Sequence, residues 1–219
     1  MITLQELMKN EDVRALITRA DESLLALGYT EHAFAHVTKV ADCAGEILAL
    51  LGYAEHDVEL ARVAGYLHDI GNLVNRVEHS QSGAVMAFVL LSRLGMDIPD
   101  IATVTAAIGN HDEGEGVPVN AVAAALILAD KSDVRRSRVR NHDKTTFDIH
   151  DRVNYSVEES ELIVSPETRE ITLRLSINTK YGSVMDYFEI FLGRMILCRK
   201  AAERLGTTFR LEINGQTLL

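Results

Sequence analysis

The spacing of apolar positions changes once along the chain, from a helical period to a strand period. Up to about residue 130, apolar residues recur three and four positions apart, the spacing of one buried helix face. One such face consists of Leu60, Val63, Ala64 and Leu67. The first 130 residues therefore predict successive amphipathic helices.

Three more helices are predicted in this part of the chain. Residues 84–94 are apolar enough for a buried helix, and Gly95 after them is typical of a helix C-terminus. Residues 119–130 give the most apolar helix. A further stripe consists of Ile101, Val104 and Ile108.

Beyond about residue 150 the pattern becomes that of a half-buried strand. Apolar residues occupy every second position from Ile171 to Ile177, with polar residues between them. A weaker strand is expected at about residues 153–164, with the segment SPETRE as the turn between the two.

A long helix and a third strand are predicted near the end. Ser183 is a typical N-cap residue for a helix over residues 184–205, and Gly206 follows that helix. Alternation returns at residues 209–213, and Asn214-Gly215 is a tight-turn signal.

The predicted fold class is mainly α, with a small α+β appendage. Residues 1–150 are expected to form a multi-helix bundle, and residues 151–219 a small β-β-α-β subdomain. The chain of 219 residues suffices for one sizeable core, or for one large and one small domain. The appendage is expected to pack against the bundle or to form a homodimer.

Composition restricts the setting and the partners. No apolar run reaches the roughly 18 residues of a membrane span, and the N-terminal residues lack the pattern of a signal peptide. Cys43 and Cys198 form neither a disulfide framework nor a zinc pattern, which favours a reducing cytoplasm. The net charge of −10 argues against nucleic-acid polymers and membrane surfaces, since both are polyanions.

Histidine followed by aspartate is frequent here and by itself says little. The five such pairs are at 56–57, 68–69, 111–112, 142–143 and 150–151. The pair at 56–57 is expected at an exposed helix start, and those at 142–143 and 150–151 in a polar, solvated connection. His68-Asp69 differs because it ends a strongly apolar helix, where a buried carboxylate needs an opposite charge or a metal. A hydrogen-bonded core histidine with a capping aspartate is the alternative.

Other candidate ligands stand near the ends of apolar helices. His36 is predicted on one helix face with His32, one turn away. His79 precedes an apolar helix and His111 follows one. Asp130 ends the most apolar helix, where a carboxylate is unfavourable unless a cation faces it. Imidazole and carboxylate together suit a borderline divalent ion.

In this order, these residues resemble the HD superfamily of metal-dependent phosphohydrolases over roughly residues 30–135. The matching elements are His36 in HVTKVADCA, His68-Asp69 in LHDIGN, His79 in HSQSGA, His111 in IGNHDEG and Asp130 in LADKSD. The resemblance implies a helical HD-type domain that hydrolyses a phosphate ester or anhydride with metal-activated water.

The resemblance also assigns roles by position. The residues that match the first metal site are His36, His68, Asp69 and Asp130. His79 and His111 match the extra pair of branches with a dinuclear centre, in which Asp69 would bridge both ions. One or two divalent ions are expected (Mn, Fe, Ni, Co, Zn or Mg), and Asp69 and His111 are also predicted to be catalytic.

Some branches of the superfamily match better than others. The signalling phosphodiesterase branch carries a GYP element and a second histidine, which this chain lacks around His111, and this argues against a cyclic-di-GMP phosphodiesterase. The short spacing from Asp69 to His79 resembles small nucleotide-cleaving members. The expected substrate is a nucleotide or another small phosphorylated metabolite. A di-iron oxygenase and a catalytically silent sensing module are the alternatives.

A basic segment follows Asp130 in this otherwise acidic chain. If the helix continues, Lys131, Arg135 and Arg138 form one stripe. They are predicted to bind substrate phosphate, for which arginine forks and lysine charges are suited. A solvated face paired with local acids is the alternative. The candidates for protonating the leaving group are His32, Asp112 and Glu113.

Overall fold

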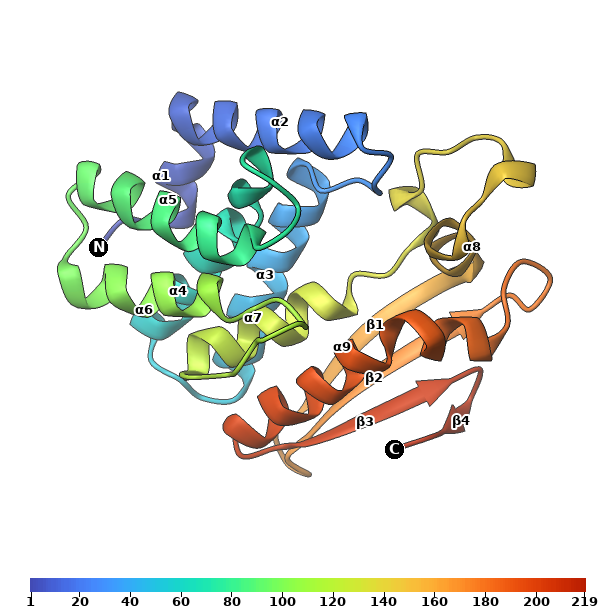
Figure 1. The fold of residues 1–219 in the computed structure, drawn as a ribbon. Helices are drawn as coiled ribbons and strands as arrows, with labels where there is room; N and C mark the ends of the chain where they lie inside the picture. The colour runs from blue at the N-terminus through green and yellow to red at the C-terminus, as the bar shows by residue number, and fades with distance from the viewer.

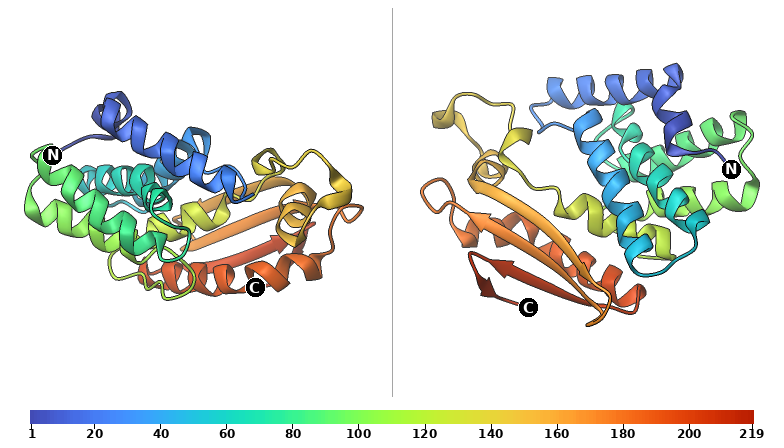
Figure 2. Two further views of the ribbon diagram at one scale, coloured as in Figure 1. Left: turned by 45° about the horizontal axis from the view of Figure 1, so that its top comes forward. Right: turned by 180° about the vertical axis from the view of Figure 1, so that it is seen from behind.

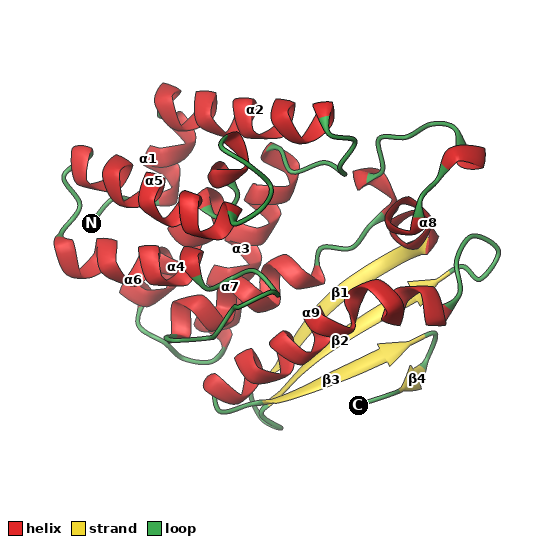
Figure 3. Cartoon of the chain, viewed as in Figure 1, coloured by secondary structure: helices red, strands yellow, loops and turns green.

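The computed structural model describes all 219 residues and contains nine α-helices and one small sheet (Figures 1 and 3). The helices are α1 (Leu4–Lys9), α2 (Glu11–Ala26), α3 (Phe34–Leu50), α4 (Glu55–Leu67), α5 (His79–Arg93), α6 (Ile98–Gly109), α7 (Ala121–Ser132), α8 (Ile149–Ser156) and α9 (Val184–Arg204). The strands are β1 (Val157–Ser165), β2 (Glu170–Ile177), β3 (Thr208–Ile213) and β4 (Gln216–Thr217). The predicted fold class, mainly helical with a small β-containing appendage, is confirmed.

The helical part follows the apolar periodicity closely. All four residues of the stripe in α4 are buried, as are those of the stripe in α6. In α7 every side chain from Val122 to Ala129 is buried, because this helix packs against α3, α4, α6 and α9. The strongly apolar sequence of α7 is therefore explained by its central place, with neighbours on all sides.

Two glycines allow close backbone approach around the His68-Asp69 pair. A Cβ atom on Gly65 of α4 would lie 2.7 Å from the Cα atom of Ala41 in α3. A Cβ atom on Gly71 would collide with the carbonyl oxygen of His79, at the start of α5. Larger side chains at these positions would push α3 and α5 away from the end of α4, so the two glycines help to bring the elements of the site together.

The C-terminal sheet has the order β1-β2-β3-β4 and is covered on one face by α9 (Figures 1 and 2). Strands β1 and β2 pair antiparallel, and α9 is the crossover to β3, which pairs parallel to β2. Ser183 caps α9 in a capping box with Asp186, as its sequence position predicts. The first strand begins at Val157 instead of residue 153, because α8 occupies the preceding residues. The two-residue β4 was not predicted.

A continuous apolar core joins the two parts of the chain. Its 53 buried residues run from Leu4 in α1 to Ile213 in β3. Helix α9 packs against both α7 and β3. The division at residue 150 is therefore not marked by separate cores, and it stays a prediction. None of the helices combines the length and the apolar character needed to cross a membrane.

Candidate metal centre

Four histidines from four different elements meet inside the helical part. His36 lies in α3, His68 follows α4, His79 begins α5 and His111 follows α6. All four are buried, with at most 2% of their surface exposed. The Nε2 atoms of His36 and His68 are 3.3 Å apart, and those of His79 and His111 are 3.2 Å apart. The histidines thus form two pairs with facing ring nitrogens.

The other ring nitrogen of three histidines is held by main-chain carbonyl groups. Nδ1 of His68, His79 and His111 lies 2.7, 3.1 and 2.6 Å from the oxygens of Gly65, Arg76 and Ile108, respectively. Because a carbonyl oxygen only accepts, Nδ1 donates the proton and Nε2 of the neutral ring keeps its lone pair. Lone pairs that face each other at about 3 Å repel unless a cation or a proton lies between them, so this arrangement fits a metal site.

Two carboxylates complete the cluster. Asp69 Oδ2 lies 3.3 Å from His68 Nε2, and Asp69 Oδ1 lies 3.5 Å from His79 Nε2. Asp130 Oδ1 lies 3.4 Å from His36 Nε2. Asp69 Oδ2 is buried without a hydrogen-bond partner, which is costly unless a cation approaches it. Asp69 therefore turns one oxygen toward each histidine pair, as a carboxylate that bridges two ions would.

Burial and the carboxylates together determine the protonation of the cluster. Burial lowers the pKa of His79 and of His111, because a charged ring is poorly solvated there. Burial acts in the same direction on His68, but the neighbouring carboxylates outweigh it and raise the pKa of His68 to about 10. Burial would raise the pKa of Asp69, yet the charge of His68 holds it well below its usual range. The cluster thus retains a proton on His68 that a bound divalent ion would replace.

Asp133, which the sequence analysis did not single out, holds His36 in place. It is almost completely buried, and its Oδ2 accepts a hydrogen bond from His36 Nδ1 at 2.8 Å. Lys39 Nζ and Arg135 Nε lie 2.8 and 2.9 Å from Oδ1. Burial would raise the pKa of Asp133, but the hydrogen bond from His36 and the nearby cations hold it far below its usual range. Asp133 stands just beyond the end of α7, so helix-face spacing from Asp130 gave no signal for its contact with His36.

The basic residues after Asp130 do not form the predicted helix stripe. Helix α7 ends at Ser132, because Asp133 leaves the helical conformation to meet His36 and Val134 turns into the core. Lys131 and Arg138 line the pocket over the site, whereas Arg135 does not. Arg135 instead pairs with Asp133 and Glu31. Phosphate binding by these residues stays a prediction, and the geometry favours it only for Lys131 and Arg138.

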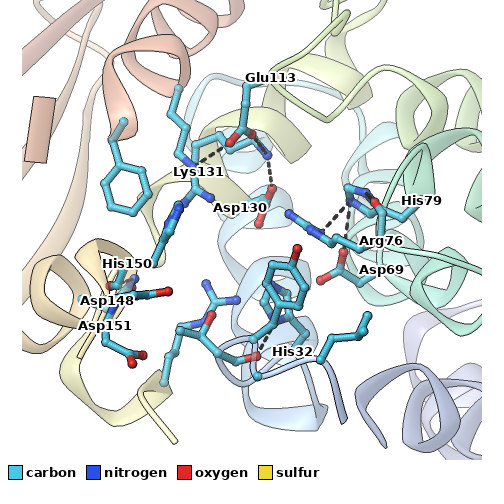
Figure 4. A pocket seen from close by; sticks show the side chains of 18 residues that line it. His32, Asp69, Arg76, His79, Glu113, Asp130, Lys131, Asp148, His150 and Asp151 are labelled. Atoms are coloured by element: carbon cyan, nitrogen blue, oxygen red, sulfur yellow. Dashed lines mark hydrogen bonds and ion pairs between the residues drawn. The ribbon is translucent and has the colours of Figure 1, made fainter. Parts of the chain in front are cut away.

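A pocket of about 380 Å³ opens over Asp69, His79 and Asp130 (Figure 4). Two cations that the sequence analysis missed line it, Arg76 and Arg194. Arg76 Nη1 lies 3.2 Å from His79 Nε2, and Arg194 reaches the pocket from α9. Isolated arginines carry no sequence signal of their own, so only the tertiary structure identifies these two.

Lys131 and Arg194 enclose Glu113 in a partly buried ion-pair network. Lys131 Nζ lies 2.7 Å from Glu113 Oε2 and 2.9 Å from Asp130 Oδ2. Arg194 Nε donates to Glu113 Oε1 at 3.0 Å. Burial would raise the pKa of Glu113, but the two cations hold it far below its usual range. Glu113 is therefore ionised at neutral pH.

Of the three candidate acids, His32 and Glu113 line the pocket and Asp112 does not. His32 precedes α3, which begins at Phe34, so the prediction that it shares a helix face with His36 is wrong. The two rings still meet edge to face, with centroids 5.4 Å apart. Burial lowers the pKa of His32 well below its usual value.

The other His-Asp pairs differ in their position relative to the pocket. His56 and His142 are exposed, as expected. His150 is exposed too, but together with Asp151 it lines the same pocket as Asp69. Figure 4 shows Asp148, His150 and Asp151 across the pocket from Asp69. The 150–151 pair is thus solvent-exposed at His150, as expected, and it also faces the pocket, which the sequence did not predict.

The sequence model of the HD domain matches residues 33–189. Uncharacterized protein MJ1020 of Methanocaldococcus jannaschii is 27% identical, over 81% of this chain and 76% of its own length. A crystal structure of a predicted HD superfamily hydrolase from an uncultured Thermotogales bacterium is 28% identical, with a TM-score of 0.44. That match covers 61% of this chain and 75% of the other. Because the domain model spans most of the chain and all six proposed metal ligands, the protein belongs to the HD domain family.

Proposed function

We propose that the protein is a metal-dependent phosphohydrolase of small phosphorylated metabolites, with nucleotides among the first candidates. The observation that carries this proposal is the cluster of facing histidine nitrogens and the unpartnered Asp69 oxygen at the base of a cation-lined pocket. The histidine nitrogens and carboxylate oxygens at the base are suitable ligands for metal ions, and the arginine and lysine side chains around them can bind a phosphoryl group.

The donor set divides naturally into two metal positions. The residues that would hold one ion are His36, His68, Asp69 and Asp130. His79, His111 and the second oxygen of Asp69 would hold the other. A divalent ion supplies Lewis acidity and a coordinated water that ionises near neutral pH.

The residues above the cluster position and stabilise the phosphoryl group. Arg76, Lys131 and Arg138 line the pocket and can donate N–H groups to phosphoryl oxygens. Lys131 is almost completely buried, and its carboxylate neighbours raise its pKa although burial opposes this, so it stays charged. Charges act more strongly in a site from which water is largely excluded.

Proton transfer falls to His32 in preference to Glu113. Glu113 is held ionised by two cations and has no proton to donate. His32 donates its Nδ1 proton to the carbonyl oxygen of Thr30 at 2.7 Å, and its Nε2 has no partner. Because burial favours the neutral ring, His32 Nε2 is suited to accept a proton and not to protonate the leaving group, the role that the sequence analysis predicted.

Metal analysis and a hydrolysis screen test the proposal. Protein purified without chelator should contain a transition metal. It should release phosphate from at least one nucleotide or sugar phosphate in the presence of Mn, Co, Ni, Mg or Fe(II). A chelator should stop the reaction, and added metal should restore it. No hydrolysis across the panel, together with oxygen uptake by the iron-loaded protein, would instead support a di-iron oxygenase.

A further inference from the structure

The pocket has two ends of different character. Around Asp69 and Asp130 it is lined by arginine and lysine side chains. The opposite end is formed by α8 and the residue before it, and it presents no arginine or lysine to the pocket. Its lining residues are Asp148, His150, Asp151 and Asn154. A ligand that fills the pocket therefore meets cations at one end and mainly acceptor oxygens at the other.

Both aspartates at the far end keep one oxygen without a protein donor. Asp148 Oδ1 accepts the backbone N–H of Asp151 at 2.7 Å and so caps α8, while its Oδ2 has no donor. Asp151 Oδ2 accepts from Asn141 at 3.2 Å, and its Oδ1 has no donor. Neither carboxylate has a lysine or arginine partner within ion-pair distance. Each carboxylate is therefore held by one oxygen and can accept a hydrogen bond with the other.

Asn154 is an independent sign of a binding site at this end. Only 7% of its surface is exposed, although it lines the pocket. Its Nδ2 donates to the carbonyl oxygen of His150 at 2.9 Å, which leaves Oδ1 without a donor. This oxygen is not among the fully buried unpaired atoms, so it stays accessible and can accept a hydrogen bond from a ligand in the pocket.

We propose that this far end binds hydroxyl groups on the organic part of a phosphomonoester. The inference rests on the proposed phosphohydrolase function and names its substrate class: sugar phosphates and ribonucleoside monophosphates. Sugar hydroxyls supply the O–H donors that Asp148, Asp151 and Asn154 lack, and carboxylates bind ribose hydroxyls in this way in other proteins. A second anionic group would be repelled there by Asp148 and Asp151.

Substrate pairs that differ in hydroxyl groups test the proposal. With metal-loaded protein, Asp151→Ala should lower kcat/KM for ribose 5-phosphate by about tenfold or more, as expected when a hydrogen bond to a charged group is lost. Phenyl phosphate, which has no hydroxyl groups, should react equally well with wild type and variant. Asp143→Ala is the matched control, since the Asp143 carboxylate is likewise held by one oxygen but lies outside the pocket.

The charge of this end is tested separately with Asp148→Asn, because asparagine preserves the helix cap. This variant should hydrolyse a ribose bisphosphate better relative to ribose 5-phosphate than wild type does. An equal change for all substrates in Asp151→Ala, or no change for any, would overturn the proposal. So would an unchanged preference in Asp148→Asn.

Further substrates identify the source of the hydroxyl groups. They also separate a failure of the proposed hydroxyl site from a failure of the proposed function. If a ribonucleoside 5′-monophosphate outperforms its 2′-deoxy counterpart only in wild type, the ligand is a nucleotide. If Asp151→Ala lowers kcat/KM for ribose 5-phosphate but not for the nucleotides, the ligand is a sugar phosphate. If wild type hydrolyses none of these compounds, the proposed function fails. Calorimetric binding of ribose 5-phosphate then decides the site: tighter binding by wild type than by Asp151→Ala supports it, and equal binding refutes it.

Discussion

The two ends of the pocket are built in different ways. At the metal end, histidines sit at or near the ends of packed helices, and their rings are hydrogen-bonded to the backbone of the same segments. At the α8 end, Asp148 and His150 are exposed and follow a connection with little regular structure. Buried side chains held by packed helices are placed precisely, whereas side chains on surface connections are less constrained by packing.

The C-terminal part connects these two ends. Helix α8 leads directly into β1, and α9 packs on the same sheet while sending Arg194 toward Glu113 (Figures 1 and 2). The sheet therefore holds α8 and α9 over the helical part and completes the pocket. The contrast between a buried metal end and a partly exposed far end leads to four predictions, from the largest expected effect to the smallest.

His68→Ala should abolish metal retention and hydrolysis. The variant removes the ring that faces His36 and takes away the nearest ring nitrogen from Asp69. Metal content measured by mass spectrometry should fall to background. His142→Ala, in another His-Asp pair but exposed, is the matched control and should keep its metal. Full metal occupancy in His68→Ala would exclude His68 as a ligand.

His79→Ala should remove one ion and leave the other. His79 and His111 face each other, His79 lies near Asp69 Oδ1, and the His111 ring also contacts the His68 ring. Metal per chain should approach two in the fully loaded wild type and fall toward one in the variant. A ratio of one in the loaded wild type would make His79 and His111 supporting residues of a mononuclear site.

Asp133→Asn should weaken metal binding through His36 without removing a ligand. The carboxylate fixes the orientation of the His36 ring, and loss of such a partner costs about ten- to a hundredfold in metal affinity. Competition with a chelator measures this change. Asp100→Asn is the control, because Asp100 is likewise buried and paired with a histidine, His56, outside the site. Equal affinities in both variants would contradict a positioning role for Asp133.

Arg76→Ala should lower kcat/KM by about tenfold while metal content stays unchanged, since its charge-assisted hydrogen bond to phosphate is lost. Arg76→Lys should recover only part of this, because lysine lacks the planar fork. Arg135→Ala is the comparison, since Arg135 lies outside the pocket. A larger loss of kcat/KM in Arg135→Ala than in Arg76→Ala, with metal content intact, would restore the original prediction from the sequence.

Local pattern was enough to predict most of the fold. The apolar stripe of α4, the alternation of β2 and the Ser183 cap of α9 depend on which face of one segment is buried, and residue spacing reports this directly. The HD domain family was indicated by resemblance, because His36, His68-Asp69 and the later ligands stand in the order and local sequence typical of that superfamily.

Only the tertiary structure decided which residues share the pocket. The basic residues after Asp130 were compatible with a continued helix, and the burial of Asp133 and Val134 ended it at Ser132. Arg194 and Asp151 reach the pocket from segments far along the chain, and no local pattern records that approach. Spacing within a segment reports its own buried face, whereas the meeting of distant segments depends on how all those faces pack together.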